Sequence, residues 1–246
     1  MECIKNRRTI RKYKTDDVSV ELLNQLLEEA FRASTMGNMQ LYSVVVSRDK
    51  QMKAALAPAH FNQPMVTQAP VVLTFCADFN RFSKWCRCRK AEPGYDNPIS
   101  FLNAVQDALL VTQNFSTLAE AHGLGICYLG TTLYNPDKII DVLHLPELVM
   151  PVATITVGYP DECPSQPDRL PLSGIIHEET YCDYTPEAID EIYAYKESLA
   201  ENHRFIEENG KETLAQVFTD VRYKKADNEY MSEALKKTLK KQGFRK

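Results

Sequence analysis

A run of basic residues close to the start of the chain has the types and spacing needed to bind an anion. Six of the first fourteen residues are Lys or Arg, five of them in the stretch RRTIRKYK at residues 7–14. Arg7 and Arg11 are four residues apart, so they share one face in a helix and also in an extended strand. Thr9 joins that face only if the segment is extended. Two guanidinium groups and a hydroxyl on one face would suit a phosphate, and a solvated basic patch is the alternative.

The composition of the whole chain shows that this basic segment is a local feature. The 246 residues are 44% hydrophobic and 25% charged, with a net charge of -4, as in an ordinary globular protein with a sizeable core. The acidic balance argues against a nucleic-acid partner. Because no apolar run reaches the length of a membrane helix and the first residues lack a secretory signal, we expect no membrane partner and a cytoplasmic location.

The cysteine and histidine residues form no recognisable metal or nucleophile motif. The seven cysteines are odd in number and have no repeated spacing, which favours free thiols in a reducing compartment. Cys86 and Cys88 are the one close pair, and they could be plain thiols, a redox pair or half of a metal site. A metal site would need a second pair or a histidine cluster, so we expect no metal. The five histidines are scattered and are interpreted as structural.

The hydrophobic pattern predicts alternating helices and strands. Ser19 is a helix N-cap for VELLNQLLEEAFRA, which ends in a polar loop containing Gly37 and Asn38. We expect further helices at 50–57, 100–122 and 136–145, the second of them central and largely buried. Buried strands are expected at 42–47, 70–78 and 149–160, with a brief strand or loop at 126–130. The charged and aromatic segment 80–97 is predicted to be a surface loop.

The glycine-rich stretch GLGICYLG at 123–130 does not fit a dinucleotide fingerprint. Such a turn follows a strand and opens a helix, whereas Gly123 and Gly125 follow a helix and precede a strand. A helix C-cap is the better interpretation of Gly123. The sequence shows no obvious acid, base or nucleophile, yet it has a candidate anion site. If the protein is an enzyme, a cofactor therefore carries the chemistry.

Four stretches, taken together and in order, resemble one known family. RRTIRKYK at 7–14, ASTMGNMQ at 33–40, GLGICYLG at 123–130 and PDRLP at 167–171 resemble the successive signatures of the nitroreductase family of FMN-dependent NAD(P)H oxidoreductases. The stretches VLTFCADFNR, SGIIHEETY and LKKQGF are similar to those of its NADPH-dependent nitroreductase and flavin reductase branch. The resemblance spans nearly the whole chain.

The resemblance implies a fold and an assembly. It implies an α+β fold with a mixed central β-sheet flanked by helices, in an intertwined homodimer with two sites at the interface. Residues 1–171 would form the FMN-binding core, and residues 172–246 a C-terminal extension embracing the partner subunit. A lone helical tail cannot bury enough surface by itself, which also favours a second copy of the chain.

The resemblance also implies the residues that bind FMN. Arg11 would stabilise the negative charge that reduction adds to the pyrimidine part of the ring, and Gln63 would hydrogen-bond the pyrimidine edge. Arg169 would hold the phosphate, although Pro167 stands where many relatives have a Lys. Ser34, Thr35 and Asn38 would reach the site of the other subunit. The implied set is completed by Arg7, Arg8 and Thr9 along the cofactor and by the backbone of Tyr128, Leu129 and Gly130 against the ring.

The implied activity is the transfer of electrons from NAD(P)H through FMN to a small nitroaromatic, quinone or flavin acceptor by a ping-pong mechanism. Two alternatives are left open. The protein could be a flavin- or nucleotide-binding module without turnover, or a thiol oxidoreductase that uses Cys86 and Cys88. The sequence names neither the physiological acceptor nor a preference for NADPH over NADH.

Overall fold

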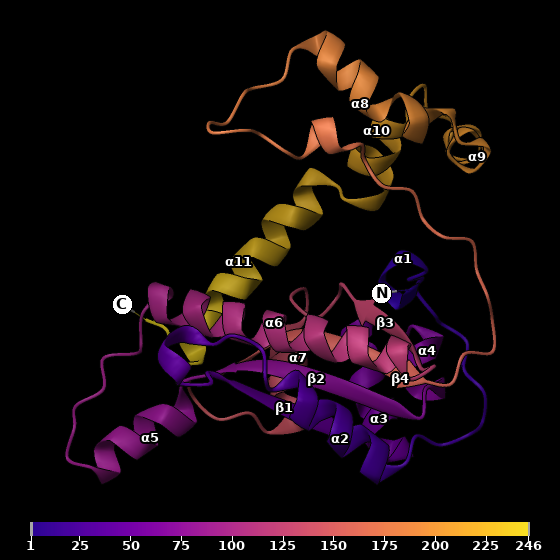
Figure 1. Cartoon of the computed structure of the whole chain (residues 1–246). Helices are drawn as coiled ribbons and strands as arrows, with labels where there is room; N and C mark the ends of the chain where they lie inside the picture. The colour runs from indigo at the N-terminus through magenta and orange to yellow at the C-terminus, as the bar shows by residue number, and fades with distance from the viewer. Residues whose placement is uncertain (1, 246) are drawn as a thin grey trace. The chain divides into compact units, whose positions relative to one another are not determined.

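A computed structural model describes residues 2–245, which form two compact units. The first unit holds residues up to Ser165 together with those from Met231 onward, and the second unit is Gln166–Tyr230. The first unit contains the β-sheet (Figure 1). Its helices are α1 (Glu2–Lys5), α2 (Val20–Ala30), α3 (Lys50–Leu56), α4 (Pro64–Gln68), α5 (Asn80–Cys88), α6 (Pro98–Ala121) and α7 (Pro136–Leu143).

The sheet has four strands in the order β1-β2-β4-β3. They are β1 (Tyr42–Ser47), β2 (Val71–Asp78), β3 (Gly125–Leu129) and β4 (Val149–Gly158). The α+β class is confirmed. The expected mixed sheet is wrong for residues 2–245, because all three strand pairs are antiparallel. Helices connect the strands, and connections of that length allow either strand direction, so the sequence pattern could not fix it.

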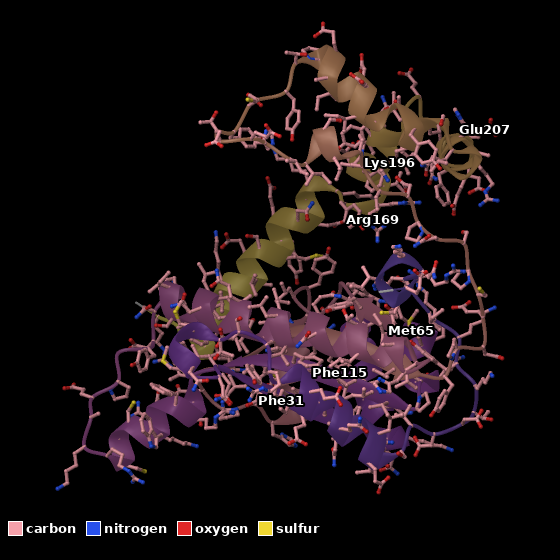
Figure 2. All side chains as sticks on the ribbon, viewed as in Figure 1. Phe31, Met65, Phe115, Arg169, Lys196 and Glu207 are labelled. Atoms are coloured by element: carbon pink, nitrogen blue, oxygen red, sulfur yellow. The ribbon has the colours of Figure 1, made fainter. Side chains whose placement is uncertain are left out.

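The two faces of the sheet carry separate apolar clusters. On one face, α2 and α6 cover alternate strand residues, among them Leu73, Phe75 and Ile155. Phe115 of α6 is fully buried in this cluster (Figure 2). On the other face, α3, α4 and α7 cover a smaller cluster that includes Val72, Cys127 and Leu129. This alternation follows from the period of two along a strand.

Helix α6 is confirmed as the longest helix, but the expectation that it is largely buried is only partly right. The residues that face the sheet, such as Ala104, Ala108 and Val111, are fully buried. Apolar residues on another side are exposed, and Leu102 and Leu110 leave 53% and 50% of their surface in solvent. The helix is apolar on more than one side, and the rest of the single chain covers only part of its apolar surface.

Segment 80–97 is not a loop throughout, as predicted, because its first half is helix α5. Phe82 packs against the main apolar cluster and Cys86 is buried. Arg81 donates hydrogen bonds to the carbonyls of Gln40 and Tyr42, which hold the start of α5 against the beginning of β1. These contacts are made with segments distant in sequence. A charge-rich composition therefore predicted a loop where the folded chain has a helix.

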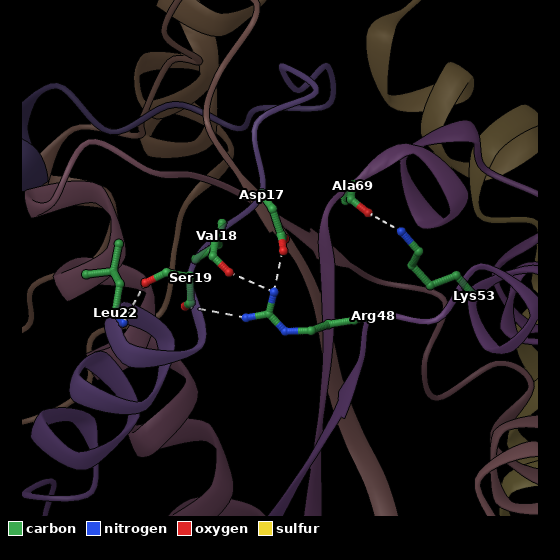
Figure 3. A network of polar contacts seen from close by, with 7 residues as sticks. All are labelled: Asp17, Val18, Ser19, Leu22, Arg48, Lys53 and Ala69. Atoms are coloured by element: carbon green, nitrogen blue, oxygen red, sulfur yellow. Dashed lines mark hydrogen bonds and ion pairs between the residues drawn. The ribbon is translucent and has the colours of Figure 1, made fainter.

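The start of α2 is fixed by a polar network at the end of β1 (Figure 3). Ser19 caps the helix by accepting a 3.1 Å hydrogen bond from the Leu22 amide, as predicted. Arg48 donates to the Asp17 carboxylate at 3.0 Å and to the Val18 carbonyl at 2.7 Å. The network therefore anchors the residues that immediately follow the basic segment.

The second unit contains α8 (Pro186–Ser198), α9 (Ala200–Glu208) and α10 (Leu214–Val217). Leu214 and Val217 are buried there, whereas Phe218 is 37% exposed. Most of helix α11 (Lys225–Lys241) belongs to the first unit, where its Leu235 and Leu239 pack with Phe244 against Ile140 and Met150. The end of the chain thus buries apolar residues within its own subunit, and the division into a core to residue 171 and an embracing extension stays a prediction.

Candidate functional site

The basic segment runs extended beside the sheet. The Ile10 amide donates to the Ile126 carbonyl of β3 at 3.0 Å, and the Lys14 amide donates to the Tyr159 carbonyl at 2.9 Å. Ile10 is buried, so Thr9 and Arg11 lie toward the other side of the segment. Gly125 makes this approach possible, because a Cβ there would lie 2.7 Å from the Ile10 side chain. The extended geometry is the one that puts Thr9 on the face shared by Arg7 and Arg11.

Two of the predicted arginines line one cavity. Arg7 forms an ion pair with Glu120 at the end of α6, with 3.8 Å between Nε and the carboxylate oxygen. Arg8 donates from Nη1 to the Cys163 Sγ at 3.0 Å and to the Pro164 carbonyl at 3.1 Å. The cavity between them has a volume of about 260 Å³ and is also lined by Glu120, Gly125 and Cys163. Burial raises the pKa of Glu120, and the Arg7 charge opposes that rise.

The backbone of Arg11 is anchored by a hydrogen bond, and its side chain is exposed. The Glu162 carboxylate accepts hydrogen bonds from the Arg11 amide at 2.6 Å and the Lys12 amide at 3.0 Å. Burial raises the pKa of the Cys127 thiol in β3, and the positive charge of Arg11 acts against that rise. The guanidinium of Arg11 therefore lies within electrostatic reach of β3.

The structure brings Gln63 and the end of β3 to the same face of the sheet as Tyr13. Gln63 is the residue that precedes α4, and Met65 of α4 belongs to the apolar cluster that contains Leu129 and is flanked by Tyr13. The Tyr128 side chain points to the opposite face, where burial raises the pKa of its phenol. Gly130 follows in an exposed position, and a Cβ built on it would meet nothing within 4 Å.

The polar loop at residues 33–40 is attached to the middle of α6. The buried Asp107 carboxylate accepts hydrogen bonds from the amides of Met36 at 2.9 Å and Leu41 at 3.1 Å. Within the loop Gly37 and Asn38 have positive φ, as expected of turn formers. The three predicted residues, of which Ser34 and Asn38 are exposed and Thr35 is half-buried, lie on this loop.

The polar loop and the basic segment meet α6 at different points. Asp107 and Glu120 are thirteen residues apart on the same helix, which corresponds to roughly 20 Å along its axis. The single chain thus attaches Ser34, Thr35 and Asn38 at a point remote from the contact of Arg7.

Arg169 lies in the second unit and is exposed (Figure 2). Its guanidinium donates to the carbonyls of Asp168 at 2.8 Å and of Pro167 at 3.4 Å. The Asp168 carboxylate also forms an ion pair with Lys196 at 2.8 Å. Whether Arg169 shares a site with the basic segment stays a prediction.

Several polar residues of this region were not predicted from the sequence. They are His60, Asp107, Glu120 and Glu162. Asp107 had a detectable signal, because Ala104, Ala108 and Val111 place it on the apolar side of its helix. Glu162 had none, since its hydrogen bonds join segments about 150 residues apart.

The geometry does not favour a redox pair at Cys86 and Cys88. Both lie on α5 as free thiols, with Cys86 buried and Cys88 exposed. Residues two apart on a helix point in different directions, so their side chains do not face each other. Among residues 2–245 no group of three or more His, Cys, Asp or Glu residues has the arrangement of a metal site. No helix in this range is both long and apolar enough to cross a membrane.

Comparison with known proteins identifies the family. Residues 4–159 match the nitroreductase family. The chain belongs to the nitroreductase family. A crystal structure from Bacteroides fragilis NCTC 9343 is similar over the full length of both chains, with 69% identity and a TM-score of 0.99.

Two curated relatives are similar to this chain over most of its length. The FMN reductase [NAD(P)H] of Bacillus subtilis strain 168 is 32% identical over 222 residues, which are 87% of this chain and 86% of that protein. The oxygen-insensitive NADPH nitroreductase of Salmonella typhimurium is 30% identical over 203 residues, which are 82% of this chain and 81% of that protein. The resemblance inferred from the sequence is therefore confirmed.

Proposed function

We propose that this protein is an FMN-dependent oxidoreductase that takes electrons from NAD(P)H and passes them to a nitroaromatic, quinone or flavin acceptor. The observation that carries the proposal is the extended basic segment beside β3, in a chain that belongs to the nitroreductase family. Relatives at about 30% identity are an FMN reductase and an NADPH nitroreductase. When bound, FMN would accept two electrons from the nicotinamide and then release them to the acceptor.

The residues present fit an aromatic cofactor with a phosphate tail. Arg7, Arg8 and Arg11 supply cations along one segment. Gly130 is exposed with open space where a side chain would project, so its backbone can approach a flat ring closely. Gln63 would bind the pyrimidine edge, Tyr128 and Leu129 would present backbone groups, and Arg169 would bind the phosphate.

The proposed mechanism is ping-pong. The exposed guanidinium of Arg11 would stabilise negative charge that develops on the pyrimidine part of the ring. NAD(P)H and the acceptor would use the same open face in turn, so the oxidised nicotinamide would leave before the acceptor binds. A shallow site over the ring would admit acceptors of different shape.

We further propose that the active form is a homodimer. Helix α6 exposes an apolar face at Ile99, Leu102, Leu109 and Leu110, which needs a covering surface in water. The polar loop is attached about 20 Å along α6 from Glu120, the partner of Arg7, so Ser34, Thr35 and Asn38 would serve the site of the other subunit. A two-fold interface would place each loop beside the basic segment of the other chain.

An NAD(P)H oxidation assay tests the proposal and separates it from its rivals. The protein is saturated with FMN, supplied with NADPH or NADH, and followed with and without a quinone. We expect acceptor-dependent oxidation that disappears when FMN is stripped from the protein. A flavin-binding module would bind FMN without oxidising NAD(P)H. A thiol enzyme would stay active without FMN and would lose activity after Cys86→Ser or Cys88→Ser.

A further inference from the structure

Two loops that the proposed function assigns to the flavin are tied to each other by polar contacts. The first, the Gln63 loop, comprises residues 57–63, and the second, the Gly130 loop, comprises residues 130–135. His60 Nδ1 lies 2.8 Å from the Thr131 hydroxyl. Asn135 donates from Nδ2 to the Ala59 carbonyl at 3.0 Å. Neither contact is between neighbours in sequence, so together they set the distance between the loops.

The Gln63 loop has a backbone conformation that needs such support. Phe61 and Asn62 have φ values of 52° and 54°, in the left-handed region that is disfavoured for residues other than glycine. The Asn62 amide donates to the Ala57 carbonyl at 2.8 Å, and the Gln63 amide donates to the His60 carbonyl at 3.2 Å. Because His60 lies inside this turn, a shift of its ring would be transmitted directly to Gln63.

The environment of His60 keeps its ring neutral. The side chain is fully buried, and burial lowers its pKa from 6.5 to about 4. Its Nε2 atom has no hydrogen-bond partner among residues 2–245. A buried acceptor without a partner is more common than a buried N–H without one, so the ring proton belongs on Nδ1. Nδ1 then donates to the Thr131 hydroxyl oxygen, and the hydroxyl proton stays available for another acceptor.

We propose that the His60–Thr131 hydrogen bond is a positioning contact that fixes Gln63 relative to the Gly130 backbone and thereby tunes FMN binding. The inference rests on the proposed function, in which Gln63 binds the pyrimidine edge and Gly130 lies against the ring. Neither His60 nor Thr131 needs to touch the cofactor. Loss of the contact would let the two loops move apart, which would weaken binding and alter how readily the bound flavin is reduced.

Substitutions at Thr131 can remove or keep the hydrogen bond with little change in side-chain volume. Thr131→Val removes the hydroxyl at nearly constant shape, and Thr131→Ser keeps it. Thr238→Val is the matched control. Thr238 is buried, and its hydroxyl also makes a hydrogen bond, which it donates to the Ala234 carbonyl of α11 at 2.9 Å. For each variant, FMN affinity is measured by fluorescence titration of the stripped protein, the flavin reduction potential by equilibration with a reference dye, and stability by thermal unfolding.

We expect Thr131→Val to raise the dissociation constant of FMN about three- to tenfold and to shift the flavin potential. Thr131→Ser should stay within about twofold of the parent, and Thr238→Val should change only the melting temperature. His60→Gln combined with Thr131→Val should weaken FMN no more than the worse of the two single changes, because both remove one contact.

Two results would overturn the inference in distinguishable ways. If the parent binds FMN and Thr131→Val binds it equally tightly with an unchanged potential, the contact is structural only and the proposed function stands. If the parent itself binds no FMN, the proposed function fails and the positioning role falls with it.

Discussion

Helix α6 carries two carboxylates that hold different kinds of structure. Asp107, in the middle of the helix, is buried and accepts two backbone hydrogen bonds from the polar loop. Glu120, at the end of the helix, is less buried and pairs at 3.8 Å with the side chain of Arg7. The first contact fixes a backbone, whereas the second is an ion pair between two side chains. The polar loop is thus joined to α6 through its backbone, whereas the basic segment is joined to α6 through a side chain.

The largest effect is expected from Asp107→Asn. Asparagine offers one acceptor oxygen and turns an amide donor toward a backbone N–H, so one buried hydrogen bond becomes a donor facing a donor. We expect the free energy of unfolding to fall by about 3 kcal/mol, measured by urea denaturation. The exposed Asp141→Asn is the control and should change it by less than about 0.5 kcal/mol. Equal effects at the two positions would show that the Asp107 contacts do not stabilise the loop.

A second large effect, on the dimer, is expected from substitutions on the exposed apolar face of α6. Leu109→Glu combined with Leu110→Glu would bury charge in the proposed dimer interface, so the dimer should dissociate. Light scattering should then give the mass of one 28.0 kDa chain, whereas the parent should give twice that mass. Tyr230→Glu, at a residue 76% exposed in the second unit, serves as a control for added charge. A parent protein that is already monomeric would contradict the proposed interface.

A smaller effect is expected from the cations assigned to the phosphate. Arg169→Ala should weaken FMN binding roughly ten- to a hundredfold, because each charge-assisted hydrogen bond contributes about that factor. Combining it with Arg7→Ala should yield a folded protein that purifies largely without flavin, since Pro167 offers no second cation. Activity should return with excess FMN. Exposed Arg89→Ala is the control. If Arg169→Ala binds FMN as tightly as the parent, the phosphate assignment is wrong.

The smallest effect is expected from Glu120→Gln. Burial raises the pKa of Glu120 in the folded state above its ordinary value of 4.5, so the folded protein holds this proton more tightly than the unfolded chain. Glu120 therefore adds stability as the pH falls from the raised pKa toward 4.5 and costs stability at neutral pH. The glutamine variant removes that cost, so it should be slightly more stable than the parent at pH 7 and should lose this advantage at lower pH. Urea denaturation of the parent and the variant at pH 7 and pH 5 measures these differences. A large loss of unfolding free energy in the variant at pH 7 would show instead that the Arg7–Glu120 ion pair stabilises the fold.

Much of the fold could be predicted from local sequence patterns. The α2 helix with its Ser19 cap, strands β1, β2 and β4, and the turn at Gly123, where φ is +77°, are set by periodicity and by single residues with special backbone preferences, whereas β3 was left open between a strand and a loop. Strand direction and helix α5 could not be predicted, because they depend on contacts between distant segments.

The candidate site shows the same division. Its basic segment was visible because Arg residues cluster in sequence, and the structure adds that the segment is extended beside β3. The partners of the residues that position the site were hidden. Asp107 lies 71 residues from the amide of Met36, and His60 lies 71 residues from Thr131. Such pairs leave no spacing pattern in a single sequence, so only the folded chain reveals them.

The most direct test of the account is the anaerobic reduction of the FMN-loaded protein in two separate steps. NADPH or NADH alone is mixed with the protein in the absence of oxygen, and the visible absorption of the flavin is followed. A quinone is added only after the oxidised nicotinamide has been removed. We expect the flavin colour to bleach in the first step, more slowly in Arg11→Ala, and to return in the second. Bleaching that requires nicotinamide and quinone together, or no bleaching of bound FMN at all, would contradict it.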